Sequence, residues 1–112
     1  MANIYKNAFY DPSTTDAVTL YTAATNANAI IQNIQITNTG GSKVVTARVT
    51  DNSASTTYLV AYASISGPTI CNIAKGPIIL EENDSILLDT TDTNGISSTL
   101  SILEVNRGLG GN

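Results

Sequence analysis

Short runs of apolar residues, each bounded by turn-forming residues, are the feature that most limits the folds open to this chain. The clearest case is residues 76–89, in which two apolar runs flank the polar stretch 81–84. Pro77 supplies no backbone donor and so suits the start of a strand, whereas the side chains of Asn83 and Asp84 can hold a tight turn. The pattern predicts a strand, a turn and a second strand.

The remaining runs extend this pattern along the chain. They lie at residues 4–10, 17–22, 30–38, 44–50, 57–65, 69–74 and 96–105. Only 12% of the residues are charged, and Thr, Ser and Asn supply most of the polarity in place of the helix formers Glu, Lys, Gln and Arg. About eight short strands at regular spacing, with no convincing helix, predict an all-β fold: an antiparallel β-sandwich that is jelly-roll-like.

Glycine-containing turns indicate how some of these strands connect. The glycine pair at 40–41 predicts a hairpin in which residues 30–38 pair with residues 44–50. The Asn-Gly pair at 94–95 predicts a second hairpin, just before the last strand.

The run at 30–38 has an irregular pattern. Its apolar side shifts between Ile31 and Ile34, because a strict period of two places these residues on opposite faces. A β-bulge between them would explain the shift.

The length of 112 residues suits a single domain. We expect the sandwich to occupy residues 17–106. Residues 1–16 are expected to form an N-terminal arm or an edge strand, because Pro12 and a cluster of polar residues separate them from the next run. Residues 107–112 are expected to be a flexible, Gly-rich tail.

Charge and composition argue against several partners. The net charge is -4, and the five basic residues are scattered along the chain, so we expect no nucleic-acid partner. The N-terminus has no basic region followed by an apolar core, and no apolar run approaches the length of a membrane span. We therefore expect no membrane partner and synthesis in a cytoplasm.

The absence of histidine removes the usual general base, the Ser-His and Cys-His dyads and most zinc sites. Carboxylate pairs drawn from Glu81, Glu82 and Glu104 could imitate a glycosidase, but acids beside a tight turn are ordinarily solvated. We expect no enzyme and no cofactor. Oxygen ligands in residues 89–95 loosely imitate a calcium loop, although the downstream Glu of such loops is missing, and whether this loop binds calcium stays open.

The run at 57–65 departs from the others because it is apolar on both faces. With a strict period of two, Tyr58, Val60 and Tyr62 share one face. Such a strand predicts an oligomer interface through those three residues. Two alternatives remain: the strand is central, with its second face covered by the N-terminal arm, or the two tyrosines form a glycan platform.

Several segments together resemble small virion proteins of tailed bacteriophages, in particular capsid decoration (cement) proteins, some relatives of which are called tail proteins. They are the stretch 20–23, the run 30–38, residues 58–59, the stretch 78–86 and the closing run 100–105, so the likeness covers residues 17–105. The resemblance implies a β-sandwich, as a homotrimer, seated on the outside of the capsid.

The leading hypothesis is therefore a structural protein of the virion, made in the host bacterial cytoplasm, that binds assembled major capsid protein and stabilises the shell. The expected capsid contacts lie in the N-terminal arm; they are Ile4, Tyr5, Lys6, Phe9 and Tyr10. The alternatives are a tail or head-tail connector subunit and a glycan-binding surface module.

Overall fold

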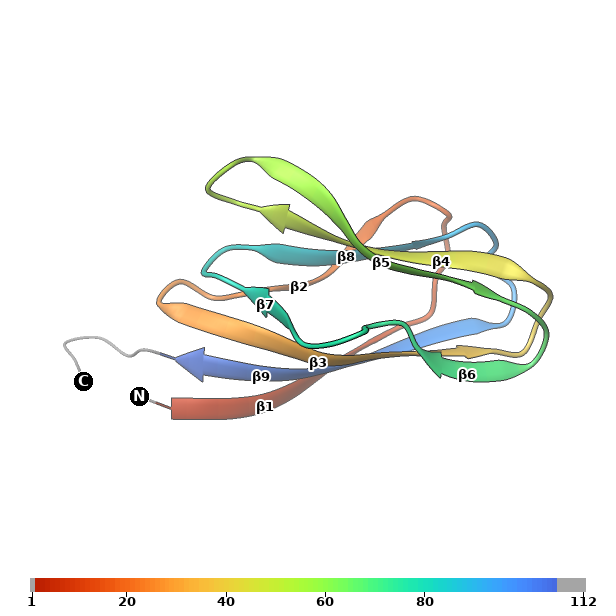
Figure 1. Ribbon diagram of the computed structural model, residues 1–112, viewed down its shortest axis with the longest axis horizontal. Helices are drawn as coiled ribbons and strands as arrows, with labels where there is room; N and C mark the ends of the chain where they lie inside the picture. The colour runs from red at the N-terminus through yellow and green to blue at the C-terminus, as the bar shows by residue number, and fades with distance from the viewer. Residues whose placement is uncertain (1, 107–112) are drawn as a thin grey trace.

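Nine strands form two antiparallel sheets that pack face to face in the computed structural model, which describes residues 2–106 (Figure 1). The strands are β1 (Ala2–Tyr10), β2 (Val18–Thr22), β3 (Ala27–Asn38), β4 (Lys43–Asp51), β5 (Thr56–Ile65), β6 (Thr69–Asn72), β7 (Ile78–Leu80), β8 (Ser85–Thr90) and β9 (Ile96–Asn106). The described residues contain no helix that is long and apolar enough to cross a membrane.

The order of the strands confirms the predicted sandwich and its jelly-roll character. One sheet has the order β1-β9-β3-β6, with β7 also paired to β3, and the other has the order β2-β8-β4-β5. The chain thus folds as antiparallel pairs, β1 with β9, β2 with β8, β3 with β6 and β7, and β4 with β5, rolled into two layers. The count is nine rather than about eight because β6 and β7 pair with opposite ends of β3.

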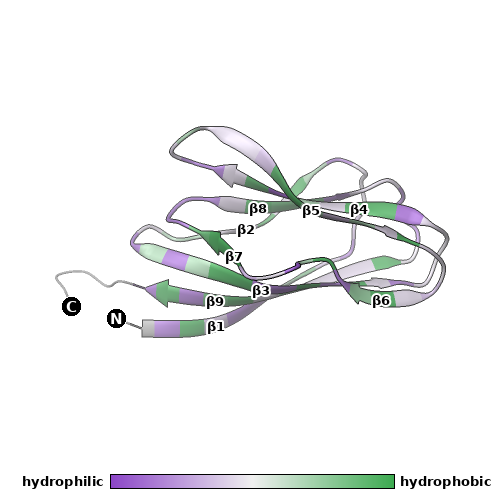
Figure 2. Ribbon diagram, in the orientation of Figure 1, coloured by the Kyte–Doolittle hydropathy of each residue, from purple (hydrophilic) through white to green (hydrophobic). Residues whose placement is uncertain are grey.

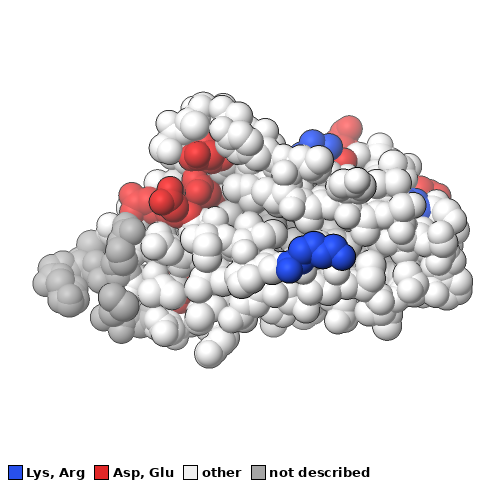
Figure 3. All heavy atoms as spheres, in the orientation of Figure 1, with Lys and Arg blue, Asp and Glu red and all other residues white. Residues whose placement is uncertain are grey.

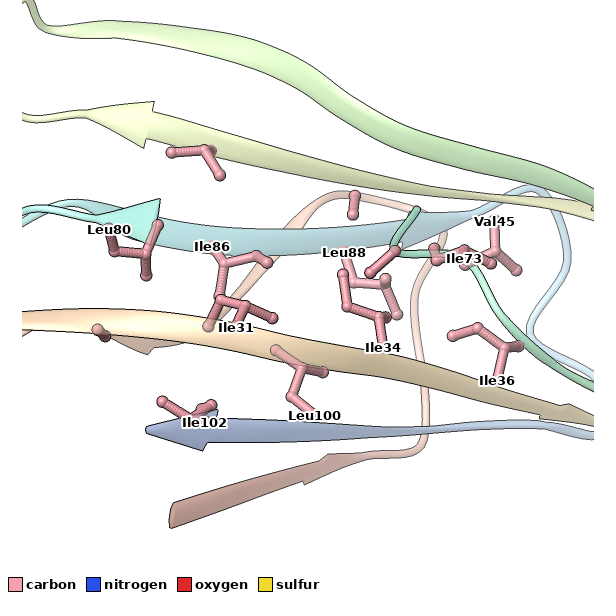
Figure 4. Close-up of a cluster of buried hydrophobic side chains, with 14 of the residues drawn as sticks. Ile31, Ile34, Ile36, Val45, Ile73, Leu80, Ile86, Leu88, Leu100 and Ile102 are labelled. Carbon is pink, nitrogen blue, oxygen red and sulfur yellow. The ribbon is translucent and has the colours of Figure 1, made fainter. Parts of the chain in front are cut away.

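The core lies between the sheets, and burial alternates along the strands that enclose it. Figure 2 shows the hydropathy of the residues in these strands, with apolar segments in both sheets. Its largest fully buried side chains are aliphatic, and several are drawn in Figure 4. Ile31 and Ile34 are both fully buried, and the register of β3 against β9 shifts between Ile31 and Asn33. The predicted bulge is therefore confirmed: one extra residue turns both isoleucines inward.

The two predicted hairpins are wrong, because both connections cross between the sheets. β3 and β4 lie in different sheets, as do β8 and β9. The glycines serve close packing between these two connections: the Thr39 N–H donates to the Gly95 carbonyl at 2.7 Å, and a Cβ on Gly40 would lie 2.5 Å from the Asn94 carbonyl oxygen. Alternation along a strand identifies its buried face but not its neighbour in the sheet.

The predicted turn at 81–84 is present, and it too links the two sheets. Asn83 adopts a positive φ of 68°, and the Asp84 carboxylate accepts the Glu81 N–H at 3.0 Å. The same carboxylate accepts the Asn52 N–H at 2.9 Å, which attaches the loop of the β4–β5 hairpin to this turn.

Residues 2–10 form β1, an edge strand that pairs with β9 along its whole length. Ala8 and Tyr10 pack against the core. Any capsid contact made by residues 2–10 would therefore involve an edge strand of the sandwich and not a separate arm. The tail predicted at 107–112 lies outside the described residues.

Candidate interaction surfaces

Strand β5 is one of the two edge strands of the four-stranded sheet, β2 being the other, and it exposes large apolar side chains. Tyr58 is 52% exposed and Tyr62 is 65% exposed, and Leu59 and Val60 are also exposed. The alternative of a central strand is wrong, since β4 is the one partner of β5 and β1 lies at the edge of the other sheet.

The predicted shared face of Tyr58, Val60 and Tyr62 is also wrong. Tyr58 pairs with Val49, which points into the core, whereas Tyr62 pairs with Thr46 on the opposite face of β4. Directly paired residues of antiparallel strands share a face, so the two tyrosines point to opposite sides of the sheet. A bulge at Val60 causes this, and it removes the single aromatic platform that the glycan alternative needs.

Two hollows run along β5, where the second sheet does not cover it. The first, of about 410 Å³, lies between the β4–β5 hairpin and β7 and is lined by Val49, Asp51, Tyr58, Val60, Ile78, Ile79, Glu81 and Asp84. The second, of about 620 Å³, is lined by residues 59–64 together with Ile73 and Lys75. Both halves of β5 are therefore bordered by a hollow whose lining is mainly apolar but also contains charged side chains: acids in the first hollow and Lys75 in the second.

A second exposed surface is the outer face of the sheet formed by β1, β9, β3, β6 and β7. Tyr5 pairs with Leu103, Leu103 with Ile30, and Ile30 with Ile79, so four apolar side chains form one row across β1, β9, β3 and β7. Phe9 lies on the same face of β1 as Tyr5, four residues further along. Tyr5 and Phe9 are 79% and 71% exposed.

No charged residue lies on this outer face among the described strands. The five strands contain two charged residues, Lys6 and Glu104, and the register places both on the inward side. Most of the other side chains on this face are Asn, Gln, Ser and Thr, and apolar Phe9, Ile70 and Val105 lie among them. The polar ones include Asn7, Asn33, Gln35, Thr37, Thr99 and Ser101. The face is therefore neutral over its whole width.

The inward pair Lys6 and Glu104 belongs to a polar cluster around the buried Glu104 carboxylate, whereas the Lys6 side chain is 41% exposed. Glu104 is 4% exposed; its Oε1 lies 3.0 Å from Lys6 Nζ and accepts a hydrogen bond from the Tyr21 hydroxyl. These two hydrogen bonds hold the pKa of Glu104 below its usual range, although burial acts in the opposite direction. Burial, followed by the contact with Glu104, raises the pKa of Tyr21 well above its usual value.

The five expected capsid contacts divide between the two sides of β1. Tyr5 and Phe9 lie on the neutral outer face, together with apolar residues that the sequence interpretation did not single out, such as Ile79 and Leu103. Ile4, Lys6 and Tyr10 are on the inward side: Lys6 contacts Glu104, and Tyr10 packs against the core. The alternation of residues 4–10 could have separated the outward from the inward side chains of β1. The strand pairing that places Tyr5 beside Leu103 could not be read from the sequence.

The carboxylates considered for catalysis or calcium binding do not form one site. Glu104 is buried between the sheets, whereas Glu81 is exposed beside the first hollow. Asp89 forms an ion pair with Arg48 at 3.1 Å, and Asp92 accepts the Asn94 N–H at 3.0 Å. Within residues 2–106 no group of three or more His, Cys, Asp or Glu side chains could hold a metal ion.

No protein-family model and no curated protein matches the sequence. Among solved structures, the chain is similar to one in the structure of the Gx strain of infectious bursal disease virus, with a TM-score of 0.57 and 12% identity. That match covers 99% of this chain and 32% of the viral chain, so this chain spans about a third of its length.

A second similar structure is that of the disulfide-linked pili of Bacillus endospore appendages. Its TM-score is 0.51 at 10% identity, over 91% of this chain and 85% of the other. At such identities the two likenesses establish the fold: a β-sandwich that also occurs in a virus structure and in a pilus structure.

Proposed function

We propose that this chain is a virion structural protein of a tailed bacteriophage that binds the outside of the assembled capsid and stabilises it, acting by binding and not by catalysis. The observation that carries the proposal is the neutral outer face of the five-stranded sheet, with its row Tyr5, Leu103, Ile30 and Ile79. The cores of protein interfaces are depleted of charged residues and enriched in aromatic ones, as this face is.

The partner that this face fits is the major capsid protein. Tyr5 and Phe9 project from β1, the strand in which the sequence interpretation placed the capsid contacts. A neutral sheet face with an apolar row near one end suits a broad contact, which the outside of an assembled shell offers. The sequence resemblance to decoration proteins supports this choice, and a fold that also occurs in a virus and in a pilus agrees with a role in an assembly.

The proposed mechanism is mass action. A protein that binds the assembled shell but not its separated subunits stabilises the shell, and many modest contacts on one particle add together. Homo-oligomerisation, which the resemblance implies as a trimer, would increase this effect by linking several contacts.

The test is to incubate undecorated heads with the purified protein, count the copies bound per particle by quantitative mass spectrometry, and follow genome release on heating. We expect saturation at a copy number that matches the capsid lattice, with release moved to a higher temperature. Binding confined to one vertex would support the head-tail connector instead. Absence of binding to heads would contradict the proposal, and a glycan array would then test the surface-module alternative.

A further inference from the structure

Strand β5 lacks the features that protect the other edges of the two sheets. β2, β6 and β7 have five, four and three residues, and β1 carries the inward-pointing Lys6. β5 has ten residues with neither a charge nor a proline, and its one irregularity is the bulge at Val60. A long, apolar and uncharged edge in a soluble protein is normally covered by a partner.

Acidic and basic side chains border different parts of β5. Figure 3 shows an acidic cluster beside the β4–β5 hairpin and a separate basic group nearer the middle of the molecule. Asp51 and Glu81 border the hollow next to Tyr58, near the start of the strand. Lys75 borders the hollow next to residues 59–64, in the middle and second half of the strand.

Lys75 and Glu81 are both available for a partner. The ion pairs within residues 2–106 are Lys6 with Glu104 and Arg48 with Asp89, so neither Lys75 nor Glu81 forms one. Both residues are exposed, whereas Lys43 is buried against the Asn38 side chain and the Gly41 carbonyl. Lys75 is thus the exposed cation of the described chain that has no carboxylate partner.

We propose that β5 is the contact surface for a second copy of this chain, with the two β5 strands antiparallel about a two-fold axis near Val60. In that arrangement the acidic end of each copy, with Asp51 and Glu81, faces Lys75 of the other. The exposed side chains of Tyr58, Leu59 and Tyr62 are covered at the same time.

A second copy fits this surface better than an unrelated segment does. The gradient from acid to base along one strand complements itself when the strand direction is reversed, which is the property of a two-fold contact. A basic peptide would be attracted to Asp51 and Glu81 but repelled by Lys75, so it would fit only part of the surface. Each β5 edge is fully used by contact with the β5 edge of the other copy, so this contact forms a dimer. A trimer would require a different surface. The proposal does not depend on capsid binding.

The experiment is light scattering of the purified protein over a range of concentrations, combined with charge reversal. We expect the unmodified chain to have twice the monomer mass. Lys75→Glu places acid against acid and Glu81→Lys places base against base, and each is expected to raise the dimer dissociation constant by roughly tenfold or more. Asp16→Lys reverses an exposed charge in the connection before β2, at the opposite edge of the sheet from β5; it is the control and should leave the dimer unchanged.

The decisive experiment mixes the Lys75→Glu and Glu81→Lys variants. A Lys75→Glu copy and a Glu81→Lys copy are complementary at both ends of the contact, so the mixture should form a heterodimer when neither variant associates alone. The double variant, Lys75→Glu with Glu81→Lys, should recover its own dimer. A monomeric or trimeric unmodified protein, or a dimer that is insensitive to all of these changes, overturns the proposal.

Discussion

The Tyr21 hydroxyl on β2 donates a hydrogen bond to the Glu104 carboxylate on β9, so a polar contact joins the two sheets beside the aliphatic core. Lys6 on β1 contacts the same carboxylate, and the Lys6 ammonium lies 5.9 Å from the centre of the Tyr21 ring. Three strands from both sheets therefore meet at one buried charge. A buried carboxylate is costly unless its partners are retained, which makes this cluster a sensitive point of the fold.

Removal of the Tyr21 hydroxyl should destabilise the fold. Tyr21→Phe keeps the ring but leaves Glu104 with one fewer donor in a buried position, and we expect a loss of about 1–3 kcal/mol in the free energy of unfolding. Urea denaturation, monitored by circular dichroism, measures this change in the free energy of unfolding. Tyr5→Phe, which removes a hydroxyl from a ring that is 79% exposed and lies outside β5, is the matched control and should change little. Equal effects of the two substitutions would contradict the assigned role of Tyr21.

The pKa of Glu104, which is lowered in the folded state, should make stability depend on pH. A glutamate in the unfolded chain has a pKa of about 4.3, and the folded value lies below it. The stabilisation is therefore present in full above the unfolded pKa and is lost as the pH falls through the folded pKa. Urea midpoints measured from neutral to acidic pH should fall more steeply for the unmodified protein than for Glu104→Gln. Parallel pH curves would exclude this linkage.

Gly95 should not tolerate a side chain. Its φ is +71°, and a Cβ would lie 2.6 Å from the Gly40 amide nitrogen, so Gly95→Ala adds backbone strain to a clash between two inter-sheet connections. We expect a loss of more than about 1 kcal/mol in the free energy of unfolding. Gly41→Ala is the control, because nothing lies within 4 Å of a Cβ there. A thermal-shift comparison in which both variants behave alike would count against this packing.

Charges introduced on the neutral outer face should weaken capsid binding without unfolding the domain. Tyr5→Asp and Phe9→Asp alter exposed side chains, so the free energy of unfolding should change by no more than about 0.5 kcal/mol. Each substitution buries a carboxylate in the proposed contact, and the number of copies bound per head should fall at a fixed protein concentration. Thr15→Asp, in an exposed loop, is the control. Undiminished binding by both outer-face variants would place the capsid contact elsewhere.

The sequence by itself determined the fold class, the positions of the strands and the turn at Asp84. Alternation and turn chemistry act over a few residues, so they are readable without knowledge of the partner strands. The bulge between Ile31 and Ile34 was predictable for the same reason, because two buried isoleucines three residues apart cannot share a regular face.

Tertiary structure alone decided which strands pair and which faces meet a partner. The glycines at 40 and 95 predict turns, but only the fold places those turns against each other between the sheets. The row from Tyr5 to Ile79 joins four segments far apart in sequence, and the bulge in β5 sends Tyr58 and Tyr62 to opposite faces. Pairing and register arise from long-range packing, and a shift of one residue reverses every face, so local patterns could not settle either surface.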